Sequence, residues 1–194
     1  MTSLALRKGG IAAIFADDGA IAGIAKEQLK AKGNFPGPLP VVLQSPSVSE
    51  ATLDAAKSAG AVAAVLPKGD GAAALAEACS KLGLEAIWAV DSSEAFESAT
   101  AAGAGVFLVS GMDEGFWGSV PKGTTAIAAL PSMLDANDEI GQGQALNAAG
   151  CKAILFQDAC VGDDEDAEYS KWASGEVLFL DCLVFARPDA TSDP

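Results

Sequence analysis

The chain has 194 residues, half of them hydrophobic, which is enough for one full-sized core and too apolar for a disordered protein. It carries 26 acidic and 12 basic side chains, and the net charge of −14 disfavours binding to nucleic acid or to anionic lipid. It has no histidine, which excludes histidine general bases and histidine metal ligands.

The four cysteines are not arranged as a disulfide framework or a zinc site. No CxxC pair is present, and all four cysteines lie in apolar stretches: Cys79, Cys151, Cys160 and Cys182. This pattern predicts buried thiols and a reducing compartment. The apolar runs are much shorter than the roughly 18 residues that a membrane helix needs. The first ten residues contain no apolar segment typical of a secretory signal, so secretion is not expected. A transit peptide that had already been removed would leave no trace in this sequence.

Eight short apolar runs follow one another along the chain, at 9–16, 39–44, 60–67, 83–90, 103–110, 123–130, 150–157 and 176–186. From Gly60 to Gly150 the glycines that introduce the runs are spaced by 23, 20, 20 and 27 residues, which leaves room for one strand, one loop and one helix. The runs are continuously apolar rather than alternating. This pattern is typical of parallel strands that are covered on both faces.

Alanine-rich amphipathic segments with helix caps separate the runs. Ser49 precedes one such segment, which ends at Gly60, and Ser92 precedes another, which ends at Gly103. Strands that alternate with helices predict βαβ units with right-handed crossovers. With seven or eight such units, the sequence favours an α/β fold. We expect a parallel (β/α) barrel, or an open sheet derived from one, rather than a doubly wound sheet.

Four segments match successive strand–helix units of one enzyme family. Leu39–Ala61 and Leu82–Met112 match without a gap, and Ala126–Met133 and Ala149–Cys160 match the last two strands. On these segments the stretch from Gly9 to Gly162 resembles the indole-3-glycerol-phosphate synthase family of TIM barrels. The resemblance implies a barrel that is truncated at the N-terminus, because nothing before residue 9 supplies the family's first strand.

The resemblance places the family's functional positions on residues that cannot perform its chemistry. The catalytic lysine corresponds to Gln44 and a strand carboxylate to Ala89, and neither side chain exchanges a proton at a useful pKa. The other positions correspond to Ser110, Leu130, Pro131, Ser132, Gln157 and Asp158. The resemblance therefore implies a pseudoenzyme with no catalytic residue and no cofactor.

Three polar motifs have a structural interpretation beside a chemical one. Asp17-Asp18 follows the first apolar run and could hold Mg²⁺, but we expect a helix cap in a solvated loop. The acidic run Asp163–Asp166 lacks the spacing of an EF-hand and is expected to start a helix. Lys68-Gly69 lacks the rest of a phosphate-binding loop and is expected in a turn. No metal site is predicted.

Several aromatic residues are candidates for protein–protein interaction. Phe116 and Trp117 lie between glycines in a predicted loop at 111–118, where aromatic side chains either anchor a contact or pack inside. The other candidates are nearer the C-terminus: Trp172, Phe179 and Phe185.

These observations favour a degenerate barrel that works by binding, as a non-catalytic structural or accessory subunit of a larger assembly. Its partners would be other protein subunits, with no nucleic acid and no direct membrane insertion. The alternatives are an enzyme with new chemistry, using Asp17, Asp91, Asp113 and Asp158 at the strand ends, and a phosphorylated-ligand binder. The acidic, histidine-free chain is similar to the stromal accessory subunit of photosystem I in diatoms. That resemblance implies a role in photosynthesis and a location in the chloroplast stroma, with the cytoplasm as the alternative.

The apolar segment Glu176–Ala186 lies beyond the family resemblance. One hypothesis pairs it with both Ile11–Ala16 and Ile154–Gln157, so that it closes the barrel by a permuted route, with Asp163–Ala173 as the crossover helix. The alternative is that it leaves the body and docks on a partner. The expected domains are a degenerate barrel at 1–162 and a C-terminal helix, strand and tail at 163–194.

Overall fold

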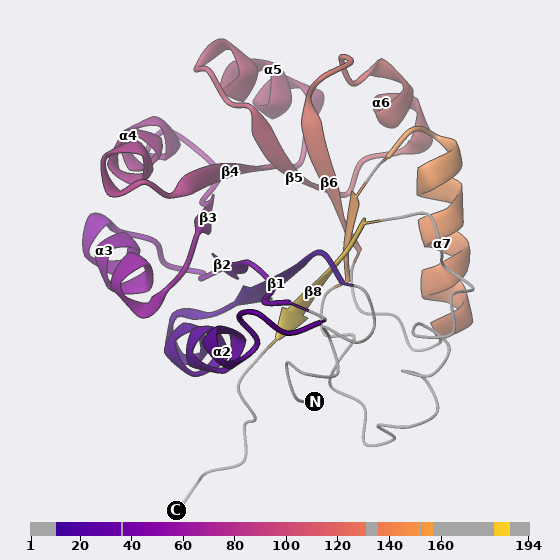
Figure 1. Ribbon diagram of the computed structural model, residues 1–194. Helices are drawn as coiled ribbons and strands as arrows, with labels where there is room; N and C mark the ends of the chain where they lie inside the picture. The colour runs from indigo at the N-terminus through magenta and orange to yellow at the C-terminus, as the bar shows by residue number, and fades with distance from the viewer. Residues whose placement is uncertain (1–10, 36, 131–135, 152, 157–180, 187–194) are drawn as a thin grey trace, which may run out of the picture.

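The computed structural model describes residues 11–35, 37–130, 136–151, 153–156 and 181–186. Within these residues, parallel strands form a ring and helices lie outside it (Figure 1). The strands are β1 (Ala13–Ala16), β2 (Val41–Leu43), β3 (Ala63–Leu66), β4 (Glu85–Val90), β5 (Val106–Ser110), β6 (Thr125–Leu130), β7 (Ala153–Phe156) and β8 (Asp181–Ala186). The helices are α2 (Asp18–Lys30), α3 (Glu50–Ala59), α4 (Ala72–Leu82), α5 (Ser93–Ala101), α6 (Glu114–Ser119) and α7 (Ala136–Ala148).

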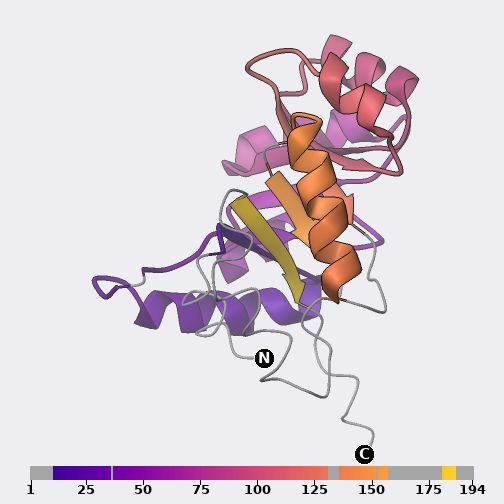
Figure 2. The same cartoon turned by 90° about the vertical axis from the view of Figure 1, so that its right-hand side faces the viewer.

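The strands pair in parallel in chain order, from β1 to β7. The last strand, β8, pairs with β7 on one side and with β1 on the other, and so closes the barrel. Figure 1 shows β8 in yellow between β1 and β7, and Figure 2 shows α7 on the outside of these strands. The predicted α/β fold is confirmed, and of its two expected forms, a parallel (β/α) barrel or an open sheet derived from one, the structure has the closed barrel.

The position of β8 decides between the two placements proposed for the apolar segment at 176–186. Leu183 is in register with both Ala13 of β1 and Leu155 of β7, so residues 181–186 lie between these two strands. The prediction of permuted closure is confirmed, and the barrel continues past residue 162. The crossover helix predicted at Asp163–Ala173 lies outside the described residues.

The strands are apolar on both faces because each face packs against something different. Successive strand residues point to opposite faces, so one set fills the barrel and the other meets the helices. The inner set includes Phe15, Val42, Val65, Leu108 and Leu155. The outer set includes Leu43, Leu66, Val90, Val109 and Leu130.

The start and end of α3 follow the predicted caps. Ser49 accepts a hydrogen bond from the backbone N–H of Thr52 at 3.2 Å, which satisfies one of the free donors at the helix N-terminus. Gly60 follows the helix with a φ of 108°, in the left-handed region. A Cβ atom at Gly60 would lie 2.8 Å from the Cβ atom of Ala25, so glycine is also required for the approach of α3 to α2.

The cysteines that the structure describes with their surroundings are buried. Cys79 and Cys151 are buried, as predicted, and burial raises the pKa of the Cys79 thiol. Cys160 lies outside the described residues. Within the described part of the chain, no helix has the length and apolar character needed to cross a bilayer.

Gln28 is a buried polar side chain that ties α2 to the connector before β2. It is 3% exposed, and its Oε1 accepts the backbone N–H of Leu39 at 2.8 Å. Its Nε2 donates to Glu27 Oε2 at 2.9 Å. Both ends of the amide therefore have partners, which is the usual condition for a buried polar group.

Replacing Gln28 with leucine is expected to destabilise the protein by about 1–3 kcal/mol, because the part-buried N–H of Leu39 loses its acceptor. Urea unfolding followed by circular dichroism measures the change. The matched control is Leu29→Gln on the same helix, at a side chain that is 70% exposed, and we expect a change within about 0.5 kcal/mol. Equal effects of the two substitutions would contradict the structural role of Gln28.

Candidate functional site

The carboxyl ends of the strands meet at one end of the barrel, where enzymes of this architecture carry their sites. A pocket of about 430 Å³ opens there, at the ends of β2 to β6. Its volume lies in the range of small-molecule sites. Its lining is mostly apolar, with Gln44, Ser45, Lys68 and Ser110 as the polar side chains.

The structure brings together three of the family positions identified in the sequence. Gln44 after β2, Ala89 on β4 and Ser110 on β5 all line this mouth pocket. Leu130 does not, because it belongs to the outer cluster and is 3% exposed. Pro131, Ser132, Gln157 and Asp158 lie outside the described residues.

Gln44 places an unsatisfied acceptor at the mouth pocket. Its backbone N–H donates to the carbonyl of Ala16 at 2.8 Å, which holds the end of β2 against β1. Its side-chain Oε1 is buried and has no hydrogen-bond partner. An unsatisfied buried acceptor costs about 1–3 kcal/mol, which a bound hydrogen-bond donor would offset.

An ion pair lies at the rim of the mouth pocket. The Nζ of Lys68, in the turn after β3, is 2.7 Å from Oδ2 of Asp91, which follows β4. Both side chains are about half exposed, at 50% and 52%. The hydrogen bond from Lys68, and then its positive charge, hold the pKa of Asp91 below its usual value of 3.8. The ammonium group that phosphate binding would use is therefore engaged by a carboxylate.

We expect Lys68→Gln to raise the pKa of Asp91 back toward 3.8. Because pairing lowers the pKa of Asp91 in the folded state, the pair stabilises the fold above pH 3.8, and this contribution is lost as the pH falls through the lower folded-state pKa. Carboxyl NMR titration measures the midpoint. Lys81→Gln is the matched control, since it breaks the exposed pair with Glu77 and should leave Asp91 unchanged. An identical Asp91 midpoint with and without Lys68 would show that the pair does not form in solution.

Two other carboxylates at the strand ends serve as helix caps. Asp17 accepts the N–H of Ala20 at 3.0 Å at the start of α2, and Asp113 accepts the N–H of Phe116 at 3.1 Å at the start of α6. The cap predicted at Asp17 is confirmed. Neither side chain lines the mouth pocket. Among the residues that the structure describes, no three acidic or cysteine side chains come together as a metal site. The acidic run at 163–166 lies outside them.

The loop predicted around Phe116 and Trp117 is wrong, because Glu114–Ser119 form α6. Both aromatic side chains are buried, at 7% and 5% exposure. Phe116 packs edge to face against Phe96, with ring centres 5.3 Å apart, and against Trp117 at 5.4 Å. The cap at Asp113 turns the segment into a helix and directs the rings inward, so these two residues are not exposed contact anchors. Trp172 and Phe179 lie outside the described residues, and Phe185 is in register with Phe15 in the pairing of β8 with β1.

Among the described residues, the large exposed aromatic side chain is Phe35, which no sequence motif marks as a contact residue. Phe35 is 100% exposed in the connector between α2 and β2. Leu29, near the end of α2, and Val62, just before β3, are 70% and 49% exposed. All three lie toward the amino ends of the strands, opposite the mouth pocket. Figure 2 shows this connector reaching away from the barrel.

Comparison with known proteins supports the architecture. The chain matches no protein-family model and no curated protein. A solved structure described as "Native KDPGal structure" is similar to it, with a TM-score of 0.62 and 12% sequence identity over 93% of this chain and 92% of that chain. The fold is TIM-barrel-like. At 12% identity the likeness extends to the fold alone, so membership of the indole-3-glycerol-phosphate synthase family is not shown.

Proposed function

We propose that this barrel is a non-catalytic accessory subunit of a larger protein assembly. The proposal rests on one observation, the chemical character of the three family positions that meet at the mouth. Gln44, Ala89 and Ser110 supply an amide, a methyl group and a hydroxyl. Removing a single general acid or base lowers a rate by about 10²–10⁴, and none of these three groups replaces one.

The carboxylates at the strand ends support this proposal over an enzyme with new chemistry. Asp17 and Asp113 hold helix N-termini, and Asp91 is paired with Lys68. The pairing lowers the pKa of Asp91, whereas a general acid at neutral pH needs a raised one. These three carboxylates thus have structural partners, and none of them lines the pocket.

Protein subunits are the partners that the exposed side chains favour. A fully exposed phenyl ring at Phe35, with Leu29 and Val62 on the same end of the barrel, offers apolar contact area away from the mouth. From the sequence resemblance we propose the stromal face of photosystem I as the assembly, and hence the chloroplast stroma as the location. An assembly in the cytoplasm is the alternative.

Sedimentation with photosystem I tests the assembly. We expect tagged protein to sediment with purified photosystem I particles that have been stripped of peripheral subunits. Phe35→Ser should weaken this association at least tenfold, and Asp18→Ser, an exposed change at the opposite end of the barrel, should leave it unchanged. Sedimentation of the wild-type chain apart from the particles would refute the photosystem assignment.

Purified protein is expected to show no ring closure of the indole-3-glycerol-phosphate synthase substrate above the uncatalysed rate, because Gln44 and Ala89 stand where proton transfer requires ionisable groups. A stopped assay that follows the indole product by fluorescence measures this, with an active family member as the positive control. Turnover that is lost in Gln44→Ala would show that the barrel is an enzyme.

The mouth pocket favours a second candidate function, the binding of a small phosphorylated or neutral ligand. The unsatisfied Oε1 of Gln44 lies at a pocket of about 430 Å³ and would accept a hydrogen bond from a ligand hydroxyl or amine. A rise in melting temperature with sugar phosphates that disappears in Gln44→Leu would support this candidate over the accessory role.

A further inference from the structure

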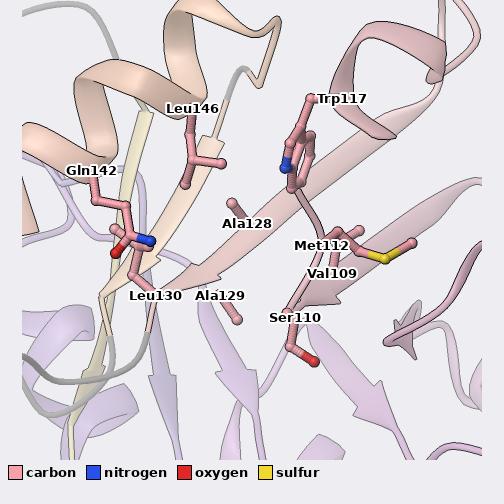
Figure 3. Close-up of a pocket in the computed structure, with 10 residues that line it drawn as sticks. Val109, Ser110, Met112, Trp117, Ala128, Ala129, Leu130, Gln142 and Leu146 are labelled. Carbon is pink, nitrogen blue, oxygen red and sulfur yellow. The ribbon is translucent and has the colours of Figure 1, made fainter. Parts of the chain in front are cut away.

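A second pocket, of about 310 Å³, lies beside the carboxyl ends of β5 and β6, beneath α6 and α7. Figure 3 shows its walls, which include Met112, Trp117, Ala128, Leu130, Gln142 and Leu146. It adjoins the mouth pocket, with which it shares Ser110 and Ala129. Most of its walls, however, belong to the layer between the strands and the helices.

Trp117 brings an unused hydrogen-bond donor to this pocket. The residue is 5% exposed, and its indole Nε1 is buried with no hydrogen-bond partner. Figure 3 shows the indole nitrogen facing the space between α6 and α7. An indole N–H can only donate, and buried donors are nearly always paired. The group that completes this site must therefore present an acceptor.

The walls also define the charge and polarity of that group. None of the side chains that line the pocket is ionisable, and the chain as a whole carries a charge of −14, so an anion finds no counter-charge there. The remaining surface is mostly aliphatic carbon and thioether, with Gln142 and Ser110 as the other polar side chains. Such a lining matches an uncharged, largely apolar molecule.

The volume sets the size of the molecule. A pocket of about 310 Å³ is roughly twice the 150 Å³ cavity that is known to hold benzene in an engineered protein core. A bicyclic ring system fits that space. A ring carbonyl would put a strong acceptor within reach of the indole N–H while the rest of the ring contacts Leu130 and Leu146.

We propose that this pocket binds a neutral bicyclic carbonyl compound, whose oxygen accepts a hydrogen bond from the indole N–H of Trp117. The site is separate from the accessory role, because the residues that carry it are not those exposed for partner binding. The outcome of the ligand-binding experiments below therefore does not depend on whether the chain binds photosystem I, which the sedimentation experiment tests.

NMR of the wild-type protein with two matched probes tests the site without any substitution. The probes are 1-indanone, which has the carbonyl, and indane, which has the same rings without it. We expect 1-indanone to shift the indole ¹H–¹⁵N signal of Trp117 downfield in a saturable way, and to bind at least tenfold more tightly than indane. The indole signal of Trp88, which is buried away from this pocket, should stay in place. No saturable shift at Trp117, or equal binding of the two probes, would overturn the proposal.

Substitution of the donor gives the second measurement. Trp117→Phe keeps an aromatic ring and removes the N–H, so it should weaken 1-indanone about tenfold and leave indane unchanged. Trp88→Phe is the matched control and should affect neither probe. Circular dichroism establishes whether each variant is folded. If Trp117→Phe does not fold, the NMR titration of the wild-type protein decides whether the pocket binds 1-indanone. Unchanged 1-indanone affinity in folded Trp117→Phe would overturn the proposed hydrogen bond.

Discussion

A chain that ends at residue 174 is expected to lose the cooperative melting transition of the full-length protein. The truncation removes β8, which pairs with four residues of β1 and with four residues of β7. Both strands would then carry unpaired N–H and C=O groups, and the inner side chains Phe15 and Leu155 would lose the cover of the closing strand. At about 0.5–1.5 kcal/mol for each hydrogen bond, together with the exposed apolar surface, the loss is of the order of the whole stability of a domain, about 5–15 kcal/mol.

Thermal unfolding followed by circular dichroism, together with the dispersion of amide proton signals, measures this effect. A chain that ends at Ala186 keeps β8 and is the matched control, which should melt close to the full-length protein. If the chain ending at residue 174 melts like the control, the pairing of β8 does not hold the barrel closed. Docking on a partner would then be the better account of this segment.

The substitution Phe107→Ala is expected to destabilise the protein by about 3–5 kcal/mol. Phe107 on β5 is fully buried, and its ring centre lies 4.4 Å from that of Phe96 on α5. Removing the ring leaves a cavity between the sheet and the helix and deprives Phe96 of one of its aromatic neighbours. Urea unfolding gives the free energy of unfolding for both proteins.

Phe35→Ala is the matched control for this substitution, because it removes the same ring from a fully exposed position. We expect a change within about 0.5 kcal/mol there. Comparable losses at Phe35 and Phe107 would contradict the placement of Phe107 in the packed layer between β5 and α5.

The barrel was predictable from the sequence because its signals are local and repeated. A continuously apolar run needs cover on both faces, and a cap such as Ser49 or a terminal glycine such as Gly60 marks the ends of the helix between two runs. The bounds of the strands were less well defined. The run at 39–44 yields only Val41–Leu43 as β2, since flanking residues can be apolar without being paired.

From the sequence, the segment that forms β8 had two possible positions, closing the barrel or docking on a partner, and no local pattern decided between them. Its composition predicts a strand, but its neighbours β1 and β7 are set by long-range pairing, which no local pattern encodes. The structure decides between the two alternatives, because β8 pairs with both β1 and β7.

The candidate site was predicted in part. Alignment with a known barrel family placed Gln44, Ala89 and Ser110 at strand ends, and closure of the ring brings them to one pocket. The partnership of Lys68 with Asp91 joins residues 23 positions apart on neighbouring strand ends, so it follows from the register of β3 and β4 rather than from any motif. For Phe116 and Trp117 the sequence left burial and partner contact as alternatives, because α6 has only six residues, too few for a helical period to show.

The closing strand also determines the order in which the molecule can be completed during synthesis. Of these strands β1 is made first and β8 last, so one of the two strands that flank β1 is added only after the seven others have been made. Until β8 is added, the other seven strands have two open sheet edges. The pairing of β1 with β8 joins residues that are far apart in the sequence, and contacts of this kind form slowly. The same gap can accept β8 from a second molecule when the chain's own β8 is late to pair. Exchange of this strand between copies is therefore the natural misassembly of this fold.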